Sequence, residues 1–306
     1  MMIKERVSVV REIAKNALMG SRIVAALRSR TATGRMPISR TDIDGNYAHA
    51  VHEWAQYTAA LREAAFPDDW WSGKAVLEIG PGTNLAVELA LVAEGAARGD
   101  ALDRFGGVRF GNGELELYRR MIDALDGERQ CRARNALVVD GDTFSFRDVI
   151  RYYPDVRLEE ADAHITQLYD VVLAHESLEH VQHLERGIQS VTRLLKPDGV
   201  CVFICHVTSL GGVYNGEVEP LRLLYYSDVV WNMMFGNRGG SNRVRASQYR
   251  DILQRSGLEI VSFSVLERMA DKELAAVKPQ FNRRFRALTD DDLAVLKFAL
   301  VARKPG

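Results

Sequence analysis

The stretch 75-AVLEIGPGTN-84 decides how this chain folds. An apolar run that contains the carboxylate of Glu78 leads into a glycine turn, and a helical pattern over 85–93 follows. Gly80 and Gly82 lack a Cβ atom, so the turn can adopt positive φ and a ligand can approach the main chain. No lysine follows the turn, which excludes a phosphate-cradling P-loop. The pattern favours a nucleotide-like ligand at a strand end, although it also fits a plain tight connection between strand and helix.

The bulk composition is that of an ordinary globular protein. The chain has 306 residues, 26% of them charged, and a net charge of -1, which argues against a dedicated nucleic-acid binder. Its cysteines, Cys131, Cys201 and Cys205, show no C-x-x-C spacing, so we expect no structural zinc and a reducing, cytoplasmic compartment. No apolar run approaches the roughly 18 residues of a membrane-spanning helix, and the N-terminus lacks the apolar core of a signal peptide.

The N-terminal segment is the most basic part of the chain. Residues 1–40 carry nine Lys or Arg residues against two Glu residues, and apolar residues recur there at helical spacing. One interpretation is a helix packed on the main domain with a solvated basic face. A second is peripheral contact with an anionic membrane surface or with a lipid-linked anionic substrate, and a third is contact with a partner protein.

Strand-like and helical patterns alternate from residue 75 onwards, which predicts an α/β fold with a mostly parallel sheet covered by helices on both faces. The predicted strands are Ala75–Ile79, Asp100–Leu102, Val156–Glu159, Tyr169–Ala174, Val200–His206, Leu258–Val265 and Leu296–Arg303. We expect an N-terminal helical extension over 1–66 and one domain over 67–306. Within that domain, 104–155 and 207–245 exceed a minimal fold, and such excursions usually form lids, substrate loops or subunit contacts, a homodimer being one option.

Two further segments carry a family resemblance. They are 169-YDVVLAHESLEHV-181 and 196-KPDGVCVF-203, a strand, a helix start, a turn and the next strand. Together with VLEIGPGTN they resemble class I S-adenosylmethionine-dependent methyltransferases over roughly 75–205, and the tail FALVARKP resembles the last strand of that fold. The resemblance implies a Rossmann-like, seven-stranded sheet with an antiparallel last strand and S-adenosylmethionine at the carboxyl ends of the strands.

The resemblance also implies roles for individual residues at the cofactor. Those beneath the methionine part are Glu78, Gly80, Pro81 and Gly82. Asp103 is the best match for the carboxylate that binds the ribose hydroxyls, with Asp100 as its rival. Asp162 and Ala163 match the pair at the adenine, and Ala174 and His175 are expected to line the cleft.

The distance from Asp103 to Asp162 is longer than this family usually has. Either 104–155 is an insertion, or the third strand is misplaced and Asp140 or Asp142 takes the adenine role. We prefer Asp162, because it lies a short distance before the strand that begins at Tyr169.

The acceptor is less clearly specified than the cofactor. A hydroxyl acceptor gains from a general base, most often histidine, and our order of candidates is His206, His180 and His175, with a structural role as the alternative for His180. In 225–247, aromatic, amide and guanidinium groups suit a sugar or an anionic acceptor; the expected contacts are Tyr226, Trp231, Asn237, Arg238, Asn242 and Arg243.

This region loosely resembles methyltransferases of bacterial polysaccharide and glycan pathways. We therefore expect O-methylation of a sugar, glycan or related small molecule. The alternatives are a natural-product or lipid hydroxyl, amine or carboxylate as acceptor, or a non-catalytic cofactor-binding subunit. No metal is expected, and the signature of base-amine methylation in nucleic acids is absent after the fourth strand.

Overall fold

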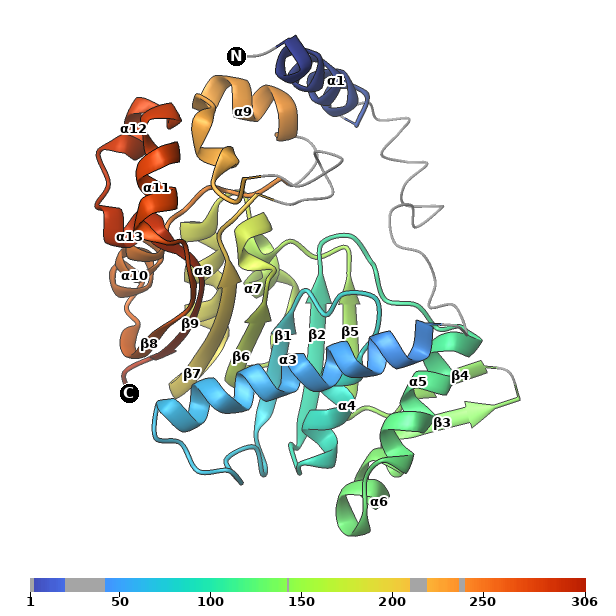
Figure 1. Ribbon diagram of the computed structural model, residues 1–306. Helices are drawn as coiled ribbons and strands as arrows, with labels where there is room; N and C mark the ends of the chain where they lie inside the picture. The colour runs from blue at the N-terminus through green and yellow to red at the C-terminus, as the bar shows by residue number, and fades with distance from the viewer. Residues whose placement is uncertain (1–2, 20–41, 142, 210–218, 237–239) are drawn as a thin grey trace.

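The computed structural model describes residues 3–19, 42–141, 143–209, 219–236 and 240–306. Within these ranges, seven strands form one sheet in the order β5-β2-β1-β6-β7-β9-β8 (Figure 1). β9 runs antiparallel to both of its neighbours, and the remaining pairs in the sheet are parallel. The strands are β1 (Ala75–Ile79), β2 (Arg98–Asp103), β5 (Ile150–Pro154), β6 (Tyr169–His175), β7 (Leu195–His206), β8 (Glu259–Arg268) and β9 (Val295–Arg303). The predicted fold class is confirmed, including the antiparallel last strand.

Helices cover both faces of the sheet because alternate residues of each strand point to opposite sides. On one face, α3 (Ile43–Glu63) packs Tyr57 and Leu61 against residues such as Val76 and Leu173. On the other face, the buried side chains of α8 (Leu184–Leu194) and α10 (Ala246–Arg255) pack in one hydrophobic cluster with Leu77, Val172 and Phe203. Figure 1 shows α3 crossing the sheet, with α4 (Ala86–Ala93) behind it.

The predicted third strand, Val156–Glu159, is wrong. The strand is β5, which pairs with β2 from Ile150 opposite Gly99 to Pro154 opposite Asp103. Asp155 ends it with a φ of 58°, and Leu158–Glu160 is a 3-10 turn, η2. β5 lies at the edge of the sheet and most of its side chains are partly or fully exposed, so it lacks the apolar run that marks the central strands.

β5 therefore lies inside 104–155. The elements that precede it there are two helices and a hairpin: α5 (Asn112–Asp123), α6 (Gly127–Ala136), and the strands β3 (Leu137–Asp140) and β4 (Thr143–Phe146). They surround Tyr118 and Phe144, in a hydrophobic cluster that also includes Leu85 and Leu89 at the α4 side of the glycine turn. This part of the chain thus supports the turn from outside the sheet.

A cap covers the carboxyl end of β7 and the neighbouring amino end of β9. Its hydrophobic cluster joins η5 (Arg222–Tyr225) and α9 (Asp228–Phe235) to α11 (Asp271–Val277), α12 (Arg283–Arg286) and α13 (Asp290–Ala294). The last three helices lie between β8 and β9, outside the range 207–245 that the sequence indicated. They are too short to produce a helical periodicity in the sequence.

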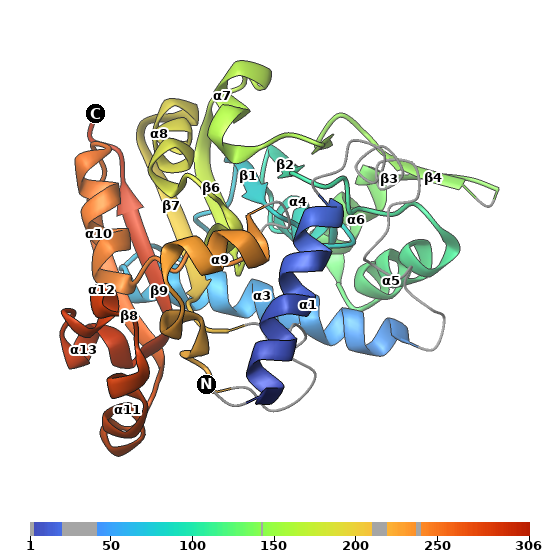
Figure 2. The same cartoon turned by 90° about the horizontal axis from the view of Figure 1, so that it is seen from above.

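The N-terminal helix α1 (Ile3–Met19) lies over α9 (Figure 2). Val9 and Ile13 pack against the cap cluster, and the Asn16 side-chain amide donates to the carbonyl oxygens of Asn232 and Met233, at 3.3 and 3.0 Å. Residues 20–41 lie outside the described ranges, so the membrane contact expected of 1–40 stays a prediction. None of the helices described is long and apolar enough to cross a membrane.

Arg245 ties the cap to the sheet. Its fully buried guanidinium donates to the carbonyl oxygens of Val207 (2.6 Å), Leu293 (3.1 Å) and Val295, which belong to the chain just after β7, to α13 and to the start of β9. Burial lowers the pKa of Arg245 to about 10, so the group keeps its charge at neutral pH. One side chain thus fixes the ends of two neighbouring strands.

Two carboxyls are buried beneath the glycine turn. Glu78 of β1 and Glu88 of α4 are 2% and 0% exposed, and the Tyr57 hydroxyl donates to Glu78 Oε1 at 3.0 Å. Burial raises the pKa of Glu88 well above its usual range, and the neighbouring Glu78 adds to the effect. Burial likewise raises the pKa of Glu78 to about 7, although the hydrogen bond from Tyr57 opposes the rise. Burial therefore favours the neutral form of both carboxyls.

We predict that Arg245→Lys lowers the free energy of unfolding by about 2 to 4 kcal/mol, because an ammonium cannot serve three carbonyls in this fork geometry. Urea denaturation measures it. The matched control is Arg186→Lys on the exposed face of α8, which should change stability by less than about 0.5 kcal/mol. Equal stability of the two variants would contradict the role assigned to Arg245.

We also predict that Glu88→Gln flattens the dependence of stability on pH. A carboxyl whose pKa is raised in the folded state contributes stability that is complete below its ordinary pKa of 4.5, and this contribution is lost as the pH rises from there through the raised pKa. From about pH 5 to pH 8, the free energy of unfolding of the wild type, measured by urea denaturation, should fall by roughly 1 to 3 kcal/mol more than that of the variant. The control is Glu116→Gln at an exposed position of α5, and its stability should depend on pH as that of the wild type does. If the stability of Glu88→Gln also had the pH dependence of the wild type, the raised pKa of Glu88 would be refuted.

Candidate cofactor and acceptor site

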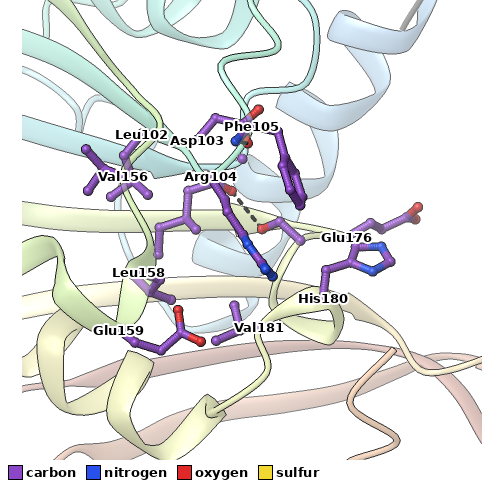
Figure 3. A pocket seen from close by; sticks show the side chains of 13 residues that line it. Leu102, Asp103, Arg104, Phe105, Val156, Leu158, Glu159, Glu176, His180 and Val181 are labelled. Atoms are coloured by element: carbon purple, nitrogen blue, oxygen red, sulfur yellow. Dashed lines mark hydrogen bonds between the residues drawn. The ribbon is translucent and has the colours of Figure 1, made fainter. Parts of the chain in front are cut away.

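The glycine turn borders a cavity of about 270 Å³ at the carboxyl ends of the parallel strands (Figure 3). The strand register brings these ends together, because Ile79 lies opposite both Leu102 and Ala174, and Asp103 lies opposite Pro154. The lining comes from the segments that follow four strands: Ile79, Gly80, Leu102, Asp103, Arg104, Phe105, Val156, Leu158, Glu159, Glu176, Ser177, His180 and Val181. This is where open α/β sheets bind ligands.

The two glycines of the turn have different functions. Gly80 and Gly82 have φ angles of 76° and 79°, in the left-handed region. A Cβ at Gly80 would lie 2.7 Å from the Cβ of Ser177, so this position must be glycine for the turn to meet the segment after β6. A Cβ at Gly82 would meet no protein atom within 4 Å. There is therefore open space beside the Cα atom of Gly82, as the approach of a ligand requires, and the neighbouring Pro81 is half-buried.

The structure separates the two candidates for the ribose carboxylate. Asp103 lines the cavity at the end of β2, and its Oδ1 accepts from the backbone N–H of Phe105 at 3.0 Å. Asp100 is fully buried and accepts from the side chains of Arg98 and Tyr169 at 2.7 and 2.8 Å. Its oxygens are therefore committed to holding the sheet, and of the two candidates it is Asp103 that lines the cavity.

Asp162 and Ala163 lie away from the cavity lining. They belong to α7 (Ala161–His164), where Asp162 accepts a hydrogen bond from Ser190 Oγ at 2.8 Å and pairs with Arg193 of α8. Because the third strand ends at Pro154, the residues that reach the cavity are Val156, Leu158 and Glu159. Of the other candidates, Asp140 stands in the exposed hairpin strand β3, and Asp142 lies outside the described residues.

His175 is held firmly at the end of β6. Its Nδ1 lies 3.2 Å from Glu53 Oε1 and its Nε2 lies 2.9 Å from Gln56 Oε1, both on α3. The ring is 7% exposed and both nitrogens are engaged, so His175 cannot readily exchange a proton with a substrate. Its neighbour Ala174 is fully buried in the core on the opposite face of the sheet.

Charged groups gather beside the cavity, where the carboxyl ends of β6 and β7 meet the start of β9. Glu176, which lines the cavity with a φ of 46°, accepts from the Lys297 ammonium at 2.7 Å, and this partner lowers its pKa although burial opposes ionisation. His206 of β7 lies opposite Lys297 in the strand pairing. We call the following residues the charged cluster: His49, Glu53, His175, Glu176, His206 and Lys297.

Two histidines named as base candidates have different surroundings. His206 is about one-third exposed, and its Nε2 lies 3.2 Å from Thr208 Oγ1 and 3.9 Å from Glu267 Oε2. His180 lies on the 3-10 turn η3 (Leu178–His180) and lines the cavity on the same side as Glu176 (Figure 3). The structure thus brings His180 and Glu176 to the cavity and places His206 in the cluster beside it.

The aromatic and basic residues expected to bind the acceptor form the interior of the cap instead. Trp231 is 8% exposed and donates to the carbonyl oxygen of Ser241 at 2.9 Å, with Tyr226 stacked on it. The guanidinium of Arg243 is buried over the Trp231 ring, donates to the Tyr226 carbonyl oxygen at 2.7 Å and pairs with Asp228. These side chains hold the cap together, which the residue types alone could not reveal.

Asn242 connects the cap to the cavity. Its side-chain amide donates to the carbonyl oxygens of Leu178 and Val181, at 2.9 and 3.0 Å, and its backbone N–H donates to that of Glu179. It therefore braces the turn that carries His180. Asn237 and Arg238 lie outside the described residues.

Comparison with known proteins shows which protein family the chain resembles. Residues 47–263 match the family model of the methyltransferase domain. Curated proteins give no significant match. The chain is similar to a solved S-adenosylmethionine dependent methyltransferase from Mesorhizobium loti, with 17% identity, a TM-score of 0.41, and coverage of 80% of this chain and 96% of that chain. It is also similar to phosphoethanolamine N-methyltransferase 2 from Haemonchus contortus, solved in complex with S-adenosyl-L-methionine, with 13% identity, a TM-score of 0.44, and coverage of 88% and 58%.

The family match spans well over half of the chain and includes most of α3, the glycine turn and every strand from β1 to β7. Among the residues described, no group of His, Cys, Asp or Glu side chains is arranged to hold a metal ion. The chain belongs to the methyltransferase domain family and is an S-adenosylmethionine-dependent methyltransferase with a Rossmann-like fold.

Proposed function

We propose that this methyltransferase methylates a hydroxyl group of a small polar acceptor, and that a sugar or related glycan unit is its substrate class. The observation that supports a hydroxyl is the charged cluster beside the cavity, which contains histidines and a paired Glu176 and Lys297. Bound S-adenosylmethionine supplies an activated methyl group, and the protein contributes position and, for a hydroxyl, a base. An amine or a carboxylate has less need of a base.

The cofactor would be held by the residues that line the cavity. Asp103 offers two carboxylate oxygens to the vicinal hydroxyls of the ribose, and Gly80 and Gly82 let the methionine part approach the main chain. We assign the adenine end to the segment after β5, where Val156 and Leu158 offer apolar surface. Glu78 then supports the turn from below through Tyr57, because its carboxyl is buried.

A lipid-linked acceptor is the second candidate, and one observation favours it. α1 and α9, which pack against each other, both expose large apolar side chains: Val10 (66%), Leu18 (65%), Val229 (69%) and Met233 (49%). The basic excess of residues 1–40 would add attraction to an anionic lipid surface. The acceptor hydroxyl would in this case be carried by a lipid-anchored sugar.

An acceptor screen tests the proposal. The enzyme and S-adenosylmethionine are incubated with free sugars, nucleotide sugars, lipid-linked sugars, and amines and carboxylic acids of similar size, and products are detected by mass spectrometry. We expect the gain of one CH2 unit on a hydroxyl compound, and none with the Gly82→Ala variant, whose strained φ and added Cβ obstruct the cofactor. Methylation confined to amines or carboxylic acids would overturn the proposal.

We predict that Asp103→Ala weakens S-adenosylmethionine binding by about 10- to 100-fold, the loss expected for charge-assisted hydrogen bonds to a diol. Isothermal titration calorimetry measures it. The affinity of Asp103→Asn should fall between the affinities of the wild type and Asp103→Ala, since an amide oxygen can still accept from Phe105 N–H. The exposed Asp123→Asn on α5 should bind like the wild type, and equal affinity in Asp103→Ala would rule out the ribose assignment.

A further inference from the structure

The geometry points to His49 of α3 as the general base that takes the proton from the acceptor hydroxyl, with Glu53 as the residue that positions it. This inference rests on the proposed function and names a residue that the sequence alone did not indicate. His49 lies before the glycine turn in the chain, on a helix within the N-terminal helical extension that the sequence predicted over 1–66.

Glu53 bridges two imidazoles of unequal exposure. Its Oε1 lies 3.4 Å from His49 Nε2 and 3.2 Å from His175 Nδ1. The side chain of His175 is 5% exposed and that of His49 is 62% exposed, so only His49 can meet a substrate. The spacing of four residues puts His49 and Glu53 on one face of α3, and the two rings stand edge to face, 6.4 Å apart.

This arrangement determines which nitrogen of His49 can act as the base. Because Nε2 faces the carboxylate, the neutral ring carries its hydrogen there and leaves Nδ1 as the acceptor. Glu53 stays ionised: burial opposes its charge, but the hydrogen bonds to His175 and His49 outweigh burial and lower its pKa. An ionised carboxylate behind an imidazole orients the ring and stabilises the imidazolium that forms, the logic of catalytic triads.

His49 is electrostatically connected to the cavity. The charged groups that act on it are Glu53 from its own helix, Glu176 just after β6 and Lys297 from β9, and Glu176 lines the cavity. The contact with Glu53 raises the pKa of His49 above 6.5, against burial, while Glu176 adds to the rise and Lys297 opposes it. A raised pKa makes the ring a stronger acceptor for the hydroxyl proton.

The other imidazoles of the charged cluster are less suited. Both nitrogens of His175 are engaged by α3. His206 has Thr208 Oγ1 at 3.2 Å, and Glu267 Oε2, at 3.9 Å, is too far for a hydrogen bond. His49 combines an exposed ring with a partly buried, ionised carboxylate partner, which neither of these residues does.

The step balances without a further reactant. A bond forms between the acceptor oxygen and the methyl carbon, the bond from that carbon to sulfur breaks, and its electron pair stays on sulfur. The hydroxyl proton passes to Nδ1 of His49, which becomes an imidazolium paired with Glu53 and later releases the proton to water.

The test uses the charge difference between donor and product. S-adenosylmethionine carries a positive sulfonium where S-adenosylhomocysteine has a neutral thioether, so a base close to the methyl group must titrate differently in the two complexes. We expect NMR titration of the histidine ring protons to show the pKa of His49 lower in the S-adenosylmethionine complex by about 0.5 or more. His164, exposed on α7, is the matched control and should titrate alike in both complexes.

Two variants separate positioning from folding. Glu53→Gln should shift the pKa of His49 down toward 6.5, because it removes the largest contribution that raises it. His49→Gln should bind S-adenosylmethionine like the wild type, since the ring is exposed, and with an acceptor from the screen should lower kcat about 100-fold or more.

The outcomes distinguish this inference from the proposed function. Failure of the wild type to bind S-adenosylmethionine in calorimetry would remove the proposed function itself. If the wild type binds S-adenosylmethionine but the pKa of His49 is equal in the two complexes, the assignment of His49 as the base is overturned. The same holds if the pKa of His206 shifts instead. Neither result contradicts the proposed methylation of a hydroxyl group.

Discussion

The close approach of two loops at the carboxyl edge of the sheet is the constraint on which the site depends. Gly80, after β1, and Ser177, after β6, are so near each other that a Cβ on the glycine would lie 2.7 Å from the serine Cβ. The Ser177 hydroxyl fixes the contact by donating to the Ile79 carbonyl oxygen at 2.7 Å. With these loops locked together, the segments after β2 and β5 complete a cavity instead of a packed core. The glycine is therefore a requirement of the tertiary structure before it is a requirement of the ligand.

Titratable groups are divided between two environments on either side of this contact. Beneath the turn, Glu78 and Glu88 are buried, and burial favours their neutral forms. Beside the cavity, Glu53 and Glu176 keep their charge because histidine or lysine partners outweigh partial burial. The neutral pair supports the turn as part of the core, whereas the ionised pair can orient imidazoles and a polar acceptor. Environment, more than residue type, thus separates structural carboxyls from candidates for chemistry.

The cap shows how a binding surface and a scaffold can be confused. Trp231 and Arg243 are residue types that are common in sugar-binding surfaces, yet here they are buried against each other. The guanidinium of Arg245 donates its hydrogen bonds to backbone carbonyl oxygens. Asn242 has a polar side chain whose partners are also carbonyls, in the turn that carries His180. These residues act on the site through the elements that they fix. Any acceptor contact from the cap comes from surfaces other than these side chains.

The sequence by itself determined the glycine turn and most strands of the sheet, because these depend on local signals such as apolar runs and turn residues. The antiparallel last strand and the expected place of Asp103 came from the family resemblance that the motifs carry. The sequence could not locate β5, because an edge strand lacks an apolar run, and Asp162, expected at the adenine, lies away from the cavity lining. Nor could it find the pairing of His49 with Glu53 and His175, or the burial of Arg243. Those depend on which surfaces of distant segments meet, and only the packing of α3 on the sheet and of the cap on the strand ends decides that.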